Sequence, residues 1–467
     1  MNAPLIIEAE PLPTPAPLEI ARRAADVAGR LTLHLARARL SRRAGQASSA
    51  RAVRRAFEEL GGTFAKFGQL VASSPSVFGE TVAQEFRGSL DAAPPEPFAA
   101  VRDVIERELD CPLEARFATF QRQPLASASL AVVHRATLLD GTPVAVKVLR
   151  PDIARRIATD LAIMRPLARI VAREVAVGVA GTVTGIVDGL EAQITEELDL
   201  RNEARSLRWF AGALEATGTD SLRVPAVHDD CSGRRVLTME FLDGVPIDDV
   251  AAIAQLGIDP VPLVHTFIRT WLATALCTGT FHGDVHAGNL LVCTDGTLAL
   301  LDWGIVGRLD TGTETFFRRM IEGVLGDENA WTDVAAHMQT IYGPGVAELL
   351  GLDDAGFATF LRSQIEPFFQ LPFGELNLRT MLLGDGVHDG KHAGSRTRSE
   401  ALRNWWQQRT LQKRRWGDSA GSFDRPTFLL SKQLVYFERY GKLFLHDTPL
   451  LDDAEAFRAL LDAPRLR

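Results

Sequence analysis

The spacing of hydrophobic and polar residues predicts strands in one part of the chain. Between residues 115 and 150 the apolar residues fall in short runs, and the last run, TPVAVKVLRP, is rich in β-branched residues. Such runs are typical of β-strands, and DGT at 140–142 has the composition of a hairpin turn. Another strand is predicted within RRVLTMEFLDGVPI (234–247), which continues into an extended segment. We therefore expect a small sheet.

Helical periodicity dominates the other long segments. Residues 56–91 follow a helical pattern with a break at Gly61–Gly62 and a boundary at Pro75. Residues 152–215 and 250 to about 370 are also predominantly helical in pattern. Strands followed by helices predict an α+β protein, with a small mixed lobe joined to a larger helical lobe.

The length of the chain extends this picture. It has 467 residues, of which 46% are hydrophobic and 24% charged. This is ordinary globular composition, but more chain than one compact core usually holds. We expect five parts: a Pro-rich disordered tail at 1–18, a helical N-terminal extension at 19–100, the small lobe at 101–243, the large lobe at 244–380 and a helical C-terminal extension at 381–467.

Charge is balanced overall but uneven locally. The net charge of −8 does not indicate a strongly acidic or basic partner, and no nucleic-acid partner is expected. Residues 20–55 carry ten arginines against the single acid Asp26. This segment is interpreted either as a solvated helix that packs its leucines inward or as a contact with an anionic membrane or acidic partner. NWWQQRTLQKRRW (404–416) has the same two interpretations, because Trp beside basic residues suits a membrane interface.

Neither a signal peptide nor a membrane span is predicted. The N-terminus lacks a basic start and a long apolar core. The weakly polar run at 175–187 is too short for the roughly 20 apolar residues of a span. The run at 263–281 is interrupted by His265 and Arg269, so we expect a buried core helix there. The four cysteines form no CxxC pair, which is typical of reduced structural cysteines. We expect a cytoplasmic protein without a transmembrane helix. Any association with lipid would be peripheral contact with an anionic membrane.

Two acids and an amide stand out in HGDVHAGNLL (282–291) and in the LLDWG that begins at Leu300. Short strands would bring Asp284, Asn289 and Asp302 to one rim of a cleft. Asn289 and Asp302 offer the hard oxygen ligands that Mg²⁺ prefers. Asp284 is then free to orient an attacking hydroxyl or to accept its proton. The spacing predicts phosphoryl transfer from a magnesium nucleotide.

Such a site needs a cation over the phosphates, and Lys147 is the candidate. Strand alternation places Ala145 and Lys147 on one face and Val144 and Val146 on the other. The small side chain of Ala145 would leave room for an adenine ring.

Lys147 in turn needs an acid on a helix packed behind it. The segment 196–206 offers four: Glu196, Glu197, Asp199 and Glu203. Only residues three or four apart share a helical face. Either Asp199 with Glu203, or Glu196 with Asp199, could therefore face inward.

These residues resemble the UbiB/AarF group of atypical, protein-kinase-like proteins linked to isoprenoid-quinone metabolism. The resemblance covers roughly residues 50 to 310, with a weaker similarity in LVYFERYGKLF (434–444). TFAKFGQL is similar to the KxGQ signature of the group through Lys66, Gly68 and Gln69. PLASASLAVVHRA resembles its alanine-rich loop, VAVKV supplies Lys147, and EELDLRNEA resembles its ExD signature. The resemblance implies a protein-kinase-like two-lobe fold with a helical N-terminal extension.

The resemblance also implies roles for the acidic and amide residues. Lys147 and Glu203 would form the ion pair that orders the nucleotide site, and Asp284 would be the acid of the catalytic loop. Asn289 and Asp302 would be the magnesium ligands. The expected cofactors are ATP or ADP and Mg²⁺.

Two further regions would complete the site. The nucleotide would contact the alanine-rich loop, Ala145 and the hinge, which comprise Ala126, Ser127, Ala128, Ser129, Ala145, Glu240, Phe241 and Leu242, with Met239 before the hinge. Lys66 and Gln69 would lie on an extension that covers the cleft, with Lys66 held by Glu197 and Asp199. In the group this cover is thought to block protein substrates and to favour ATPase-like, small-molecule or lipid-directed action.

The sequence departs from the group in three places. Ser127 and Ser129 put hydroxyls into the alanine-rich loop, Ser206 stands where many members have Asn, and Trp303 replaces the usual Phe. Three functions are compatible with the motifs. They are an atypical kinase or ATPase acting in quinone or lipid metabolism, a small-molecule phosphotransferase of the aminoglycoside or choline kinase type, and a nucleotide-gated binding protein without turnover.

Overall fold

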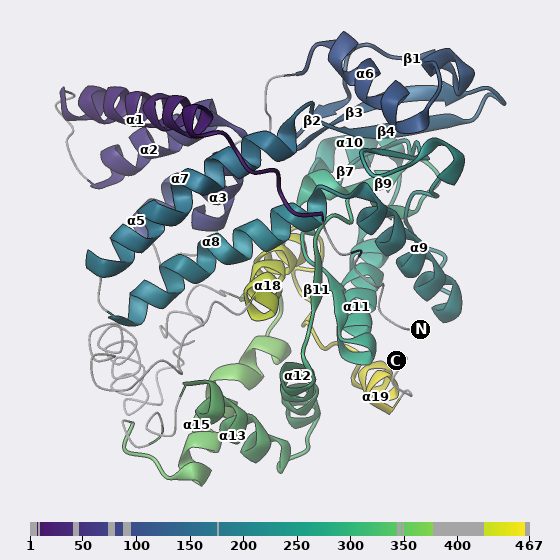
Figure 1. Cartoon of the computed structure of the whole chain (residues 1–467). Helices are drawn as coiled ribbons and strands as arrows, with labels where there is room; N and C mark the ends of the chain where they lie inside the picture. Colours follow the sequence, from purple (N-terminus) through teal and green to yellow (C-terminus); the bar gives the residue numbers. More distant parts are fainter. Residues whose placement is uncertain are drawn as a thin grey trace.

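The three-dimensional structure is a computed structural model (Figure 1). It describes residues 7, 10–40, 46–72, 80–86, 95–174, 177–342, 347, 350–376 and 425–462. The Trp- and Arg-rich segment 404–416 and most of the C-terminal extension before residue 425 lie outside the described residues.

Helices at the N-terminus form a separate layer beside the sheet (Figure 1). They are α1 (Pro17–Leu40), α2 (Gln46–Leu60), α3 (Gly62–Ala72) and α5 (Glu80–Phe86). The break predicted at Gly61–Gly62 is present, and both glycines have positive φ, 65° and 50°. That left-handed conformation is easy only for glycine and turns the chain between α2 and α3.

Of residues 1–18, for which we expected disorder, the structure describes residue 7 and residues 10–18. The backbone N–H of Ile7 donates to Asn202 Oδ1 at 2.7 Å, and Glu10 pairs with Arg234. Helix α1 already begins at Pro17. The described part of this segment therefore lies against the small lobe, held by polar contacts that its Pro-rich composition does not indicate.

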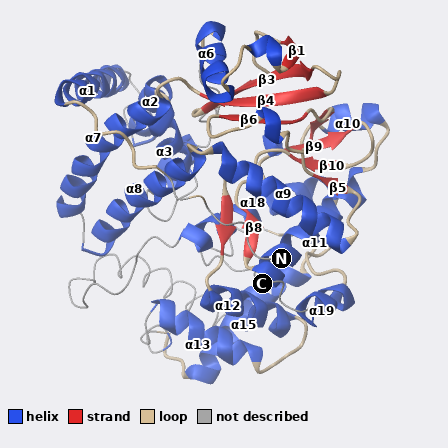
Figure 2. Cartoon of the chain, turned by 45° about the vertical axis from the view of Figure 1, so that its right-hand side comes forward, coloured by secondary structure: helices blue, strands red, loops and turns tan. Residues whose placement is uncertain are grey.

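The small lobe contains a five-stranded antiparallel sheet (Figure 2). Its order is β1–β3–β4–β6, with β2 pairing β3. The strands are β1 (Phe117–Phe120), β2 (Ala126–Ser127), β3 (Ala131–Leu138), β4 (Pro143–Leu149) and β6 (Val236–Glu240). Helix α6 (Phe98–Leu109) packs on one face of this sheet.

Alternation along β4 decides which side chains reach the site. Val144, Val146 and Val148 belong to the core under α6, whereas Ala145 and Leu149 join the main core on the other face. Lys147 is on this second face, as the alternation predicted. Helices α7 (Ile153–Glu174), α8 (Val177–Glu197) and α9 (Leu200–Thr217) follow β4 and carry the chain past that face.

The large lobe is mostly helical and contains two small sheets. One has the order β5–β10–β9–β7 and the other pairs β11 with β8. The strands are β5 (Leu222–Arg223), β7 (Gly244–Pro246), β8 (Thr280–His282), β9 (Leu290–Cys293), β10 (Leu298–Leu300) and β11 (Val306–Arg308). The helices are α10 (Val250–Leu256), α11 (Pro260–Thr278), α12 (Thr311–Val324), α13 (Ala330–Tyr342), α15 (Asp354–Gln370), α18 (Arg425–Phe444) and α19 (Ala454–Asp462), and short 3-10 turns lie at Leu113–Ala115, Asp229–Cys231 and Ala287–Asn289.

Helix α11 is the core helix predicted at 263–281, and it buries residues such as Phe267 and Trp271. Among the described residues, no single helix has the length and hydropathy to cross a membrane. Only α10 and α11 together meet that test, and they are bent by 115° at the break between them.

A buried ion pair joins the N-terminal helices to the small lobe. Asp160 on α7 is fully buried and accepts from Arg23 Nε of α1 at 2.7 Å. Arg23 also donates to the carbonyl oxygen of Leu60 at the end of α2. Burial raises the pKa of Asp160 above its ordinary value, although Arg23 pulls the pKa down. One arginine therefore connects α1, α2 and α7.

We predict that Arg23→Ala destabilises the protein by about 3–5 kcal/mol at pH 7, because it leaves a buried carboxylate without its partner. The loss should shrink as the pH falls toward 5, because Asp160 then takes up a proton and no longer needs the cation. Urea unfolding at both pH values measures this. Arg22→Ala, which removes an exposed arginine one position earlier, is the control. Equal effects of the two substitutions would contradict the prediction.

Candidate active site between the two lobes

Lys147 lies at the centre of a cluster of charges between the lobes. Its Nζ donates to both oxygens of Glu203 at 2.8 Å and to Asp302 Oδ2 at 2.8 Å. Glu203 comes from α9 behind the sheet, and Asp302 follows β10 of the large lobe. Glu203 is buried, whereas the side chain of Asp302 is 42% exposed. Asp302 is therefore the acid that a ligand in the cleft can reach.

The pKa values follow from burial and from the neighbouring charges. Burial and the charge of Asp302 raise the pKa of Glu203 to about 7, against the opposing pull of Lys147. For Asp302, the partial loss of hydration acts to raise the pKa, but the charge and hydrogen bond of Lys147 outweigh it and hold the pKa below its ordinary value. Asp302 is thus ionised at neutral pH and is ready to bind a cation.

Helical spacing alone did not decide which acid pairs with Lys147, and the structure shows why. The segment 196–206 is not one helix, because α8 ends at Glu197 and α9 begins at Leu200. Asp199 is the N-cap of α9, with its carboxylate accepting from the backbone N–H of Arg201. Asp199 and Glu203 are both buried, but Glu203 is the one that contacts Lys147, whereas Asp199 caps α9.

Lys66 and Glu197 form a second ion pair beside this cluster. Lys66 Nζ on α3 donates to Glu197 Oε1 at 2.6 Å, and both side chains are nearly buried. Asp199 does not share this contact as we expected, because it caps α9 and pairs with Arg201 at 2.6 Å. Gln69 lies three residues after Lys66 on the same helix. The structure thus brings the N-terminal helices to the rim of the site.

The alanine-rich loop is held by an arginine that the sequence did not single out. Arg150, buried at the end of β4, donates to the carbonyl oxygen of Ala128 at 2.9 Å and to Ser127 Oγ at 2.9 Å. Its remaining nitrogen pairs with Glu96 at 2.6 Å. Ser127, one of the departures from the family pattern, therefore serves to fix the loop, and Ser129 is buried close by.

The hinge lies where β6 leaves the sheet. The side chain of Glu240 points to Arg223 at 2.5 Å, and its backbone N–H donates to the carbonyl oxygen of Ala226. Leu242 is buried with Cys293 and Ala299 in the large lobe. Any contact of Glu240 with a nucleotide base would thus involve its backbone, since its carboxylate is engaged elsewhere.

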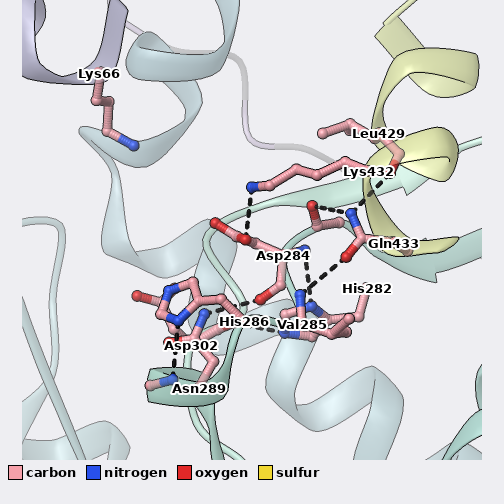
Figure 3. Close-up of polar contacts among 12 residues, drawn as sticks. Lys66, His282, Asp284, Val285, His286, Asn289, Asp302, Leu429, Lys432 and Gln433 are labelled. Carbon is pink, nitrogen blue, oxygen red and sulfur yellow. Dashed lines mark hydrogen bonds and ion pairs between the residues drawn. The ribbon is translucent and has the colours of Figure 1, made fainter. Parts of the chain in front are cut away.

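Asp284 lies in a loop fixed by hydrogen bonds from several directions (Figure 3). His282 accepts from the backbone N–H of Asp284 and bonds to the carbonyl oxygen of Asp302 at 2.7 Å. Burial lowers the pKa of His282 to about 4, so its ring is neutral at pH 7. Asn289 Nδ2 donates to the carbonyl oxygen of Asp284 at 3.0 Å. His282 packs and bonds within the loop as predicted, and His286 accepts from the backbone N–H of Gly288.

Asn289 and Asp302 fit the pair of magnesium ligands that the motifs imply. The register of β9 and β10 pairs Leu290 with Leu300, and the backbone N–H of Leu301 donates to the carbonyl oxygen of Asn289. Asn289 and Asp302 therefore flank one end of the same strand pair. The amide oxygen of Asn289 and the ionised carboxylate of Asp302 are hard ligands, and phosphate oxygens or water complete such a shell. In the described part of the chain, no three His, Cys, Asp or Glu residues gather into a metal cluster.

Sequence reasoning missed the residues that approach Asp284 from the C-terminal region. Lys432 Nζ on α18 donates to Asp284 Oδ1 at 2.6 Å, and the next residue, Gln433, bonds to the backbone on both sides of Asp284 (Figure 3). Burial acts to raise the pKa of Asp284, but the charge of Lys432 holds it below its ordinary value. A signal was present in the sequence, because Gln433 interrupts an apolar helical stripe that includes Leu429, Phe437 and Tyr440.

A small antiparallel sheet carrying a lysine, an acid on the helix behind it, and a loop with Asp and Asn in the large lobe define a protein-kinase-like fold. Residues 89–334 match the ABC1 atypical kinase-like domain family. The chain belongs to this family, and the expected kinase-like α+β fold with a helical N-terminal region is confirmed. Lys66 and Lys432 lie outside the matched residues.

Curated relatives agree with this assignment. The chain is 40% identical over 270 residues to an uncharacterized protein of Mycobacterium tuberculosis, covering 58% of this chain and 55% of the relative. It is 32% identical to an uncharacterized chloroplastic aarF domain-containing protein kinase of Arabidopsis thaliana, covering 86% and 73%. It is 33% identical to a probable protein kinase UbiB of Xanthomonas campestris, covering 73% and 61%. The resemblance to the UbiB/AarF group is therefore confirmed, and the chain spans only 55% to 73% of the length of these relatives.

A solved structure of the erythromycin complex of Rv3197 from Mycobacterium tuberculosis also aligns with the chain. The identity is 24%, the TM-score is 0.47, and the match covers 84% of this chain and 91% of the other.

The revised role of Asp199 can be tested by its effect on stability. We predict that Asp199→Ala lowers the free energy of unfolding by about 1 kcal/mol, because the first turn of α9 loses its cap. Asp199→Asn should retain most of the stability, since Asn is an equally good N-cap. Chemical denaturation of the three proteins gives the answer, and an Asn variant as unstable as the Ala variant would exclude capping as the cause.

Proposed function

We propose that this chain is an atypical kinase or ATPase that uses Mg-ATP. The observation that carries the proposal is the Lys147–Glu203–Asp302 cluster facing a loop that holds Asp284 and Asn289. This arrangement supplies a cation for the phosphates, an acid to order that cation, two oxygen ligands for a metal and a carboxylate, Asp284, for the acceptor.

Each residue has a distinct task in this proposal. Lys147 contacts the phosphates, and the backbone of the alanine-rich loop, fixed by Arg150, lies over them. Asn289 and Asp302 hold the magnesium. The metal, when bound, neutralises charge on the phosphate oxygens. Asp284 orients the hydroxyl of water or of an acceptor and takes its proton as the new bond to the γ-phosphorus forms and the bond to ADP breaks.

The acceptor is proposed from the relatives. The relative in Xanthomonas campestris is named as a probable protein kinase UbiB, and the resemblance to the UbiB/AarF group implies a link to isoprenoid-quinone metabolism. We propose that the substrate or beneficiary is a lipid or quinone precursor, handled in the cytoplasm or at an anionic membrane surface. The alternatives of a small-molecule phosphotransferase and a nucleotide-gated binding protein remain as outcomes of the tests below. The Lys66–Glu197 contact favours the first proposal, because a covering extension is part of the UbiB/AarF pattern.

The metal assignment predicts that Asp302→Asn weakens magnesium-dependent nucleotide binding by about 10- to 100-fold or more, since changes around a metal site cost at least that much. Calorimetric titration with ATP, with and without Mg²⁺, measures the effect. Asp229→Asn, at an exposed carboxylate that pairs with Arg208 away from the cleft, is the control and should bind as the wild type does. Unchanged affinity in Asp302→Asn would remove the metal role. Binding without any hydrolysis or transfer in the wild type would instead favour the binding-protein alternative.

The proposed cover predicts that Lys66→Ala raises ATP hydrolysis or autophosphorylation. The substitution removes the ion pair with Glu197 that holds α3 at the site, so the cleft becomes more accessible. Lys66→Arg keeps the charge and should stay closer to the wild type. Unchanged steady-state rates in Lys66→Ala would count against the cover.

A further inference from the structure

Helix α18 contacts α11 and β11 and lies beside the loop that carries Asp284 (Figure 3). Its buried face consists of Leu429, Gln433, Phe437 and Tyr440, which are at most 3% exposed. These positions are three or four residues apart and form one stripe along the helix. Gln433 is fully buried in this stripe. A buried amide is costly unless its polar atoms are hydrogen-bonded, so its contacts explain why it is there.

The amide of Gln433 connects the two peptide groups that flank Asp284. Its Nε2 donates to the carbonyl oxygen of Gly283 at 2.7 Å, and its Oε1 accepts from the backbone N–H of Val285 at 3.0 Å. Tyr440 adds a bond from its hydroxyl to the carbonyl oxygen of Val285 at 2.7 Å. Two side chains of one helix therefore fix the backbone immediately before and after Asp284.

Lys432 adds the side-chain contact. Its Nζ lies 2.6 Å from Asp284 Oδ1, and each of the two side chains is 20% exposed. The ion pair occupies one carboxylate oxygen and sets the rotation of the carboxylate. Oδ2 is then the oxygen that can accept the proton of an acceptor hydroxyl.

We propose that α18 is a positioning element of the catalytic loop, in which Lys432, Gln433 and Tyr440 hold Asp284 in the geometry needed for the chemical step. This inference rests on the proposed function and extends it. It adds to the site a helix that begins 91 residues after the matched kinase-like domain ends at residue 334. The N-terminal helices approach the nucleotide side of the site through Lys66, whereas α18 approaches the acceptor side.

Positioning and plain structural support make different predictions. A helix that only supports the large lobe would affect thermal stability, nucleotide affinity and turnover together. A helix that positions Asp284 affects kcat and leaves nucleotide affinity unchanged. Nucleotide binding depends on Lys147, Asn289 and Asp302 in the proposed function, and α18 contacts none of these three through a described hydrogen bond or ion pair. Misplacing a catalytic group by about 1 Å can cost on the order of 100-fold in rate.

The test uses the full chain and four variants: Lys432→Met, Lys432→Arg, Gln433→Met and Lys442→Met. Lys442 is the matched control, because it lies on the same helix and pairs with Glu438 at the surface. Steady-state hydrolysis of Mg-ATP gives kcat and KM, titration with Mg-ADP gives nucleotide affinity, and thermal unfolding gives Tm. We expect Lys432→Met and Gln433→Met to lower kcat by about 10- to 100-fold. KM and Mg-ADP affinity should stay close to the wild type, Lys432→Arg should recover part of kcat, and Lys442→Met should match the wild type.

Hydrogen exchange of the 283–289 loop is measured in the same proteins, because it does not depend on turnover. Gln433→Met should speed exchange at the backbone N–H of Val285, which donates to the substituted amide, while Lys442→Met should not. A wild type with neither hydrolysis nor transfer to any acceptor tested would overturn the proposed function, and faster loop exchange in Gln433→Met would still support positioning. Unchanged kcat in Lys432→Met, unchanged exchange in Gln433→Met, or a fall in kcat matched by equal losses in affinity and Tm would overturn the inference.

Discussion

The site depends on the burial of one lysine between two carboxylates that come from different parts of the chain. A buried ammonium group loses its hydration, and this cost is recovered only where anionic partners lie close by with good geometry. Glu203 and Asp302 provide that geometry at 2.8 Å each. Because Glu203 is on α9 and Asp302 follows β10, the charge of Lys147 can be satisfied only when the sheet, the helix behind it and the large lobe are assembled together. The electrostatic requirement of one side chain therefore fixes the relation of the two lobes at the cleft.

Two further lysines repeat this pattern at the edges of the site. Lys66 pairs with Glu197 and Lys432 pairs with Asp284, and both lysines lie outside the residues that match the kinase-like domain. The domain thus contributes the acids, while its N-terminal and C-terminal neighbours contribute cations. Helices from the two ends of the chain therefore reach acids at different edges of the site, α3 at Glu197 and α18 at Asp284.

Much of this could be predicted from the sequence, and the gaps have physical causes. The sequence predicted the strand at 143–149, the glycine break before α3 and the motif residues of the cleft. Each of these follows from neighbouring residues and does not depend on which distant segments pack against them. The partner of Lys147 could not be chosen by spacing alone, because the helix breaks between Glu197 and Leu200 and Asp199 becomes a cap. The break depends on capping geometry that helical periodicity does not reveal.

The contributions of Arg150, Lys432 and Gln433 were beyond a motif search for a different reason. Each acts through long-range contacts, such as the pair between Lys432 and Asp284, which are 148 residues apart. Pattern analysis does not reveal such pairs unless a residue violates the pattern of its own element. Gln433 violates the pattern of its helix, because it places an amide in an apolar stripe. Lys432 does not, because an exposed lysine on a helix looks the same whether or not it reaches an acid.

Charge balance bears on which form of nucleotide the proposed site would accept. The cleft and its edges contain three lysines, at 66, 147 and 432, against four carboxylates, at 197, 203, 284 and 302. With all of them ionised, the lysines do not neutralise the acids, and a free nucleotide polyphosphate would meet a site that is already slightly negative. Glu203, with its pKa raised to about 7, reduces this excess only in part at neutral pH. A divalent cation accompanying the phosphates would lower the negative charge that the site has to accept. The cation would also neutralise part of the charge of Asp302 that Lys147 now balances, so that Lys147 could contact the phosphates. The proposed preference for a magnesium nucleotide therefore follows from the electrostatics of the whole cluster as well as from the two ligands Asn289 and Asp302.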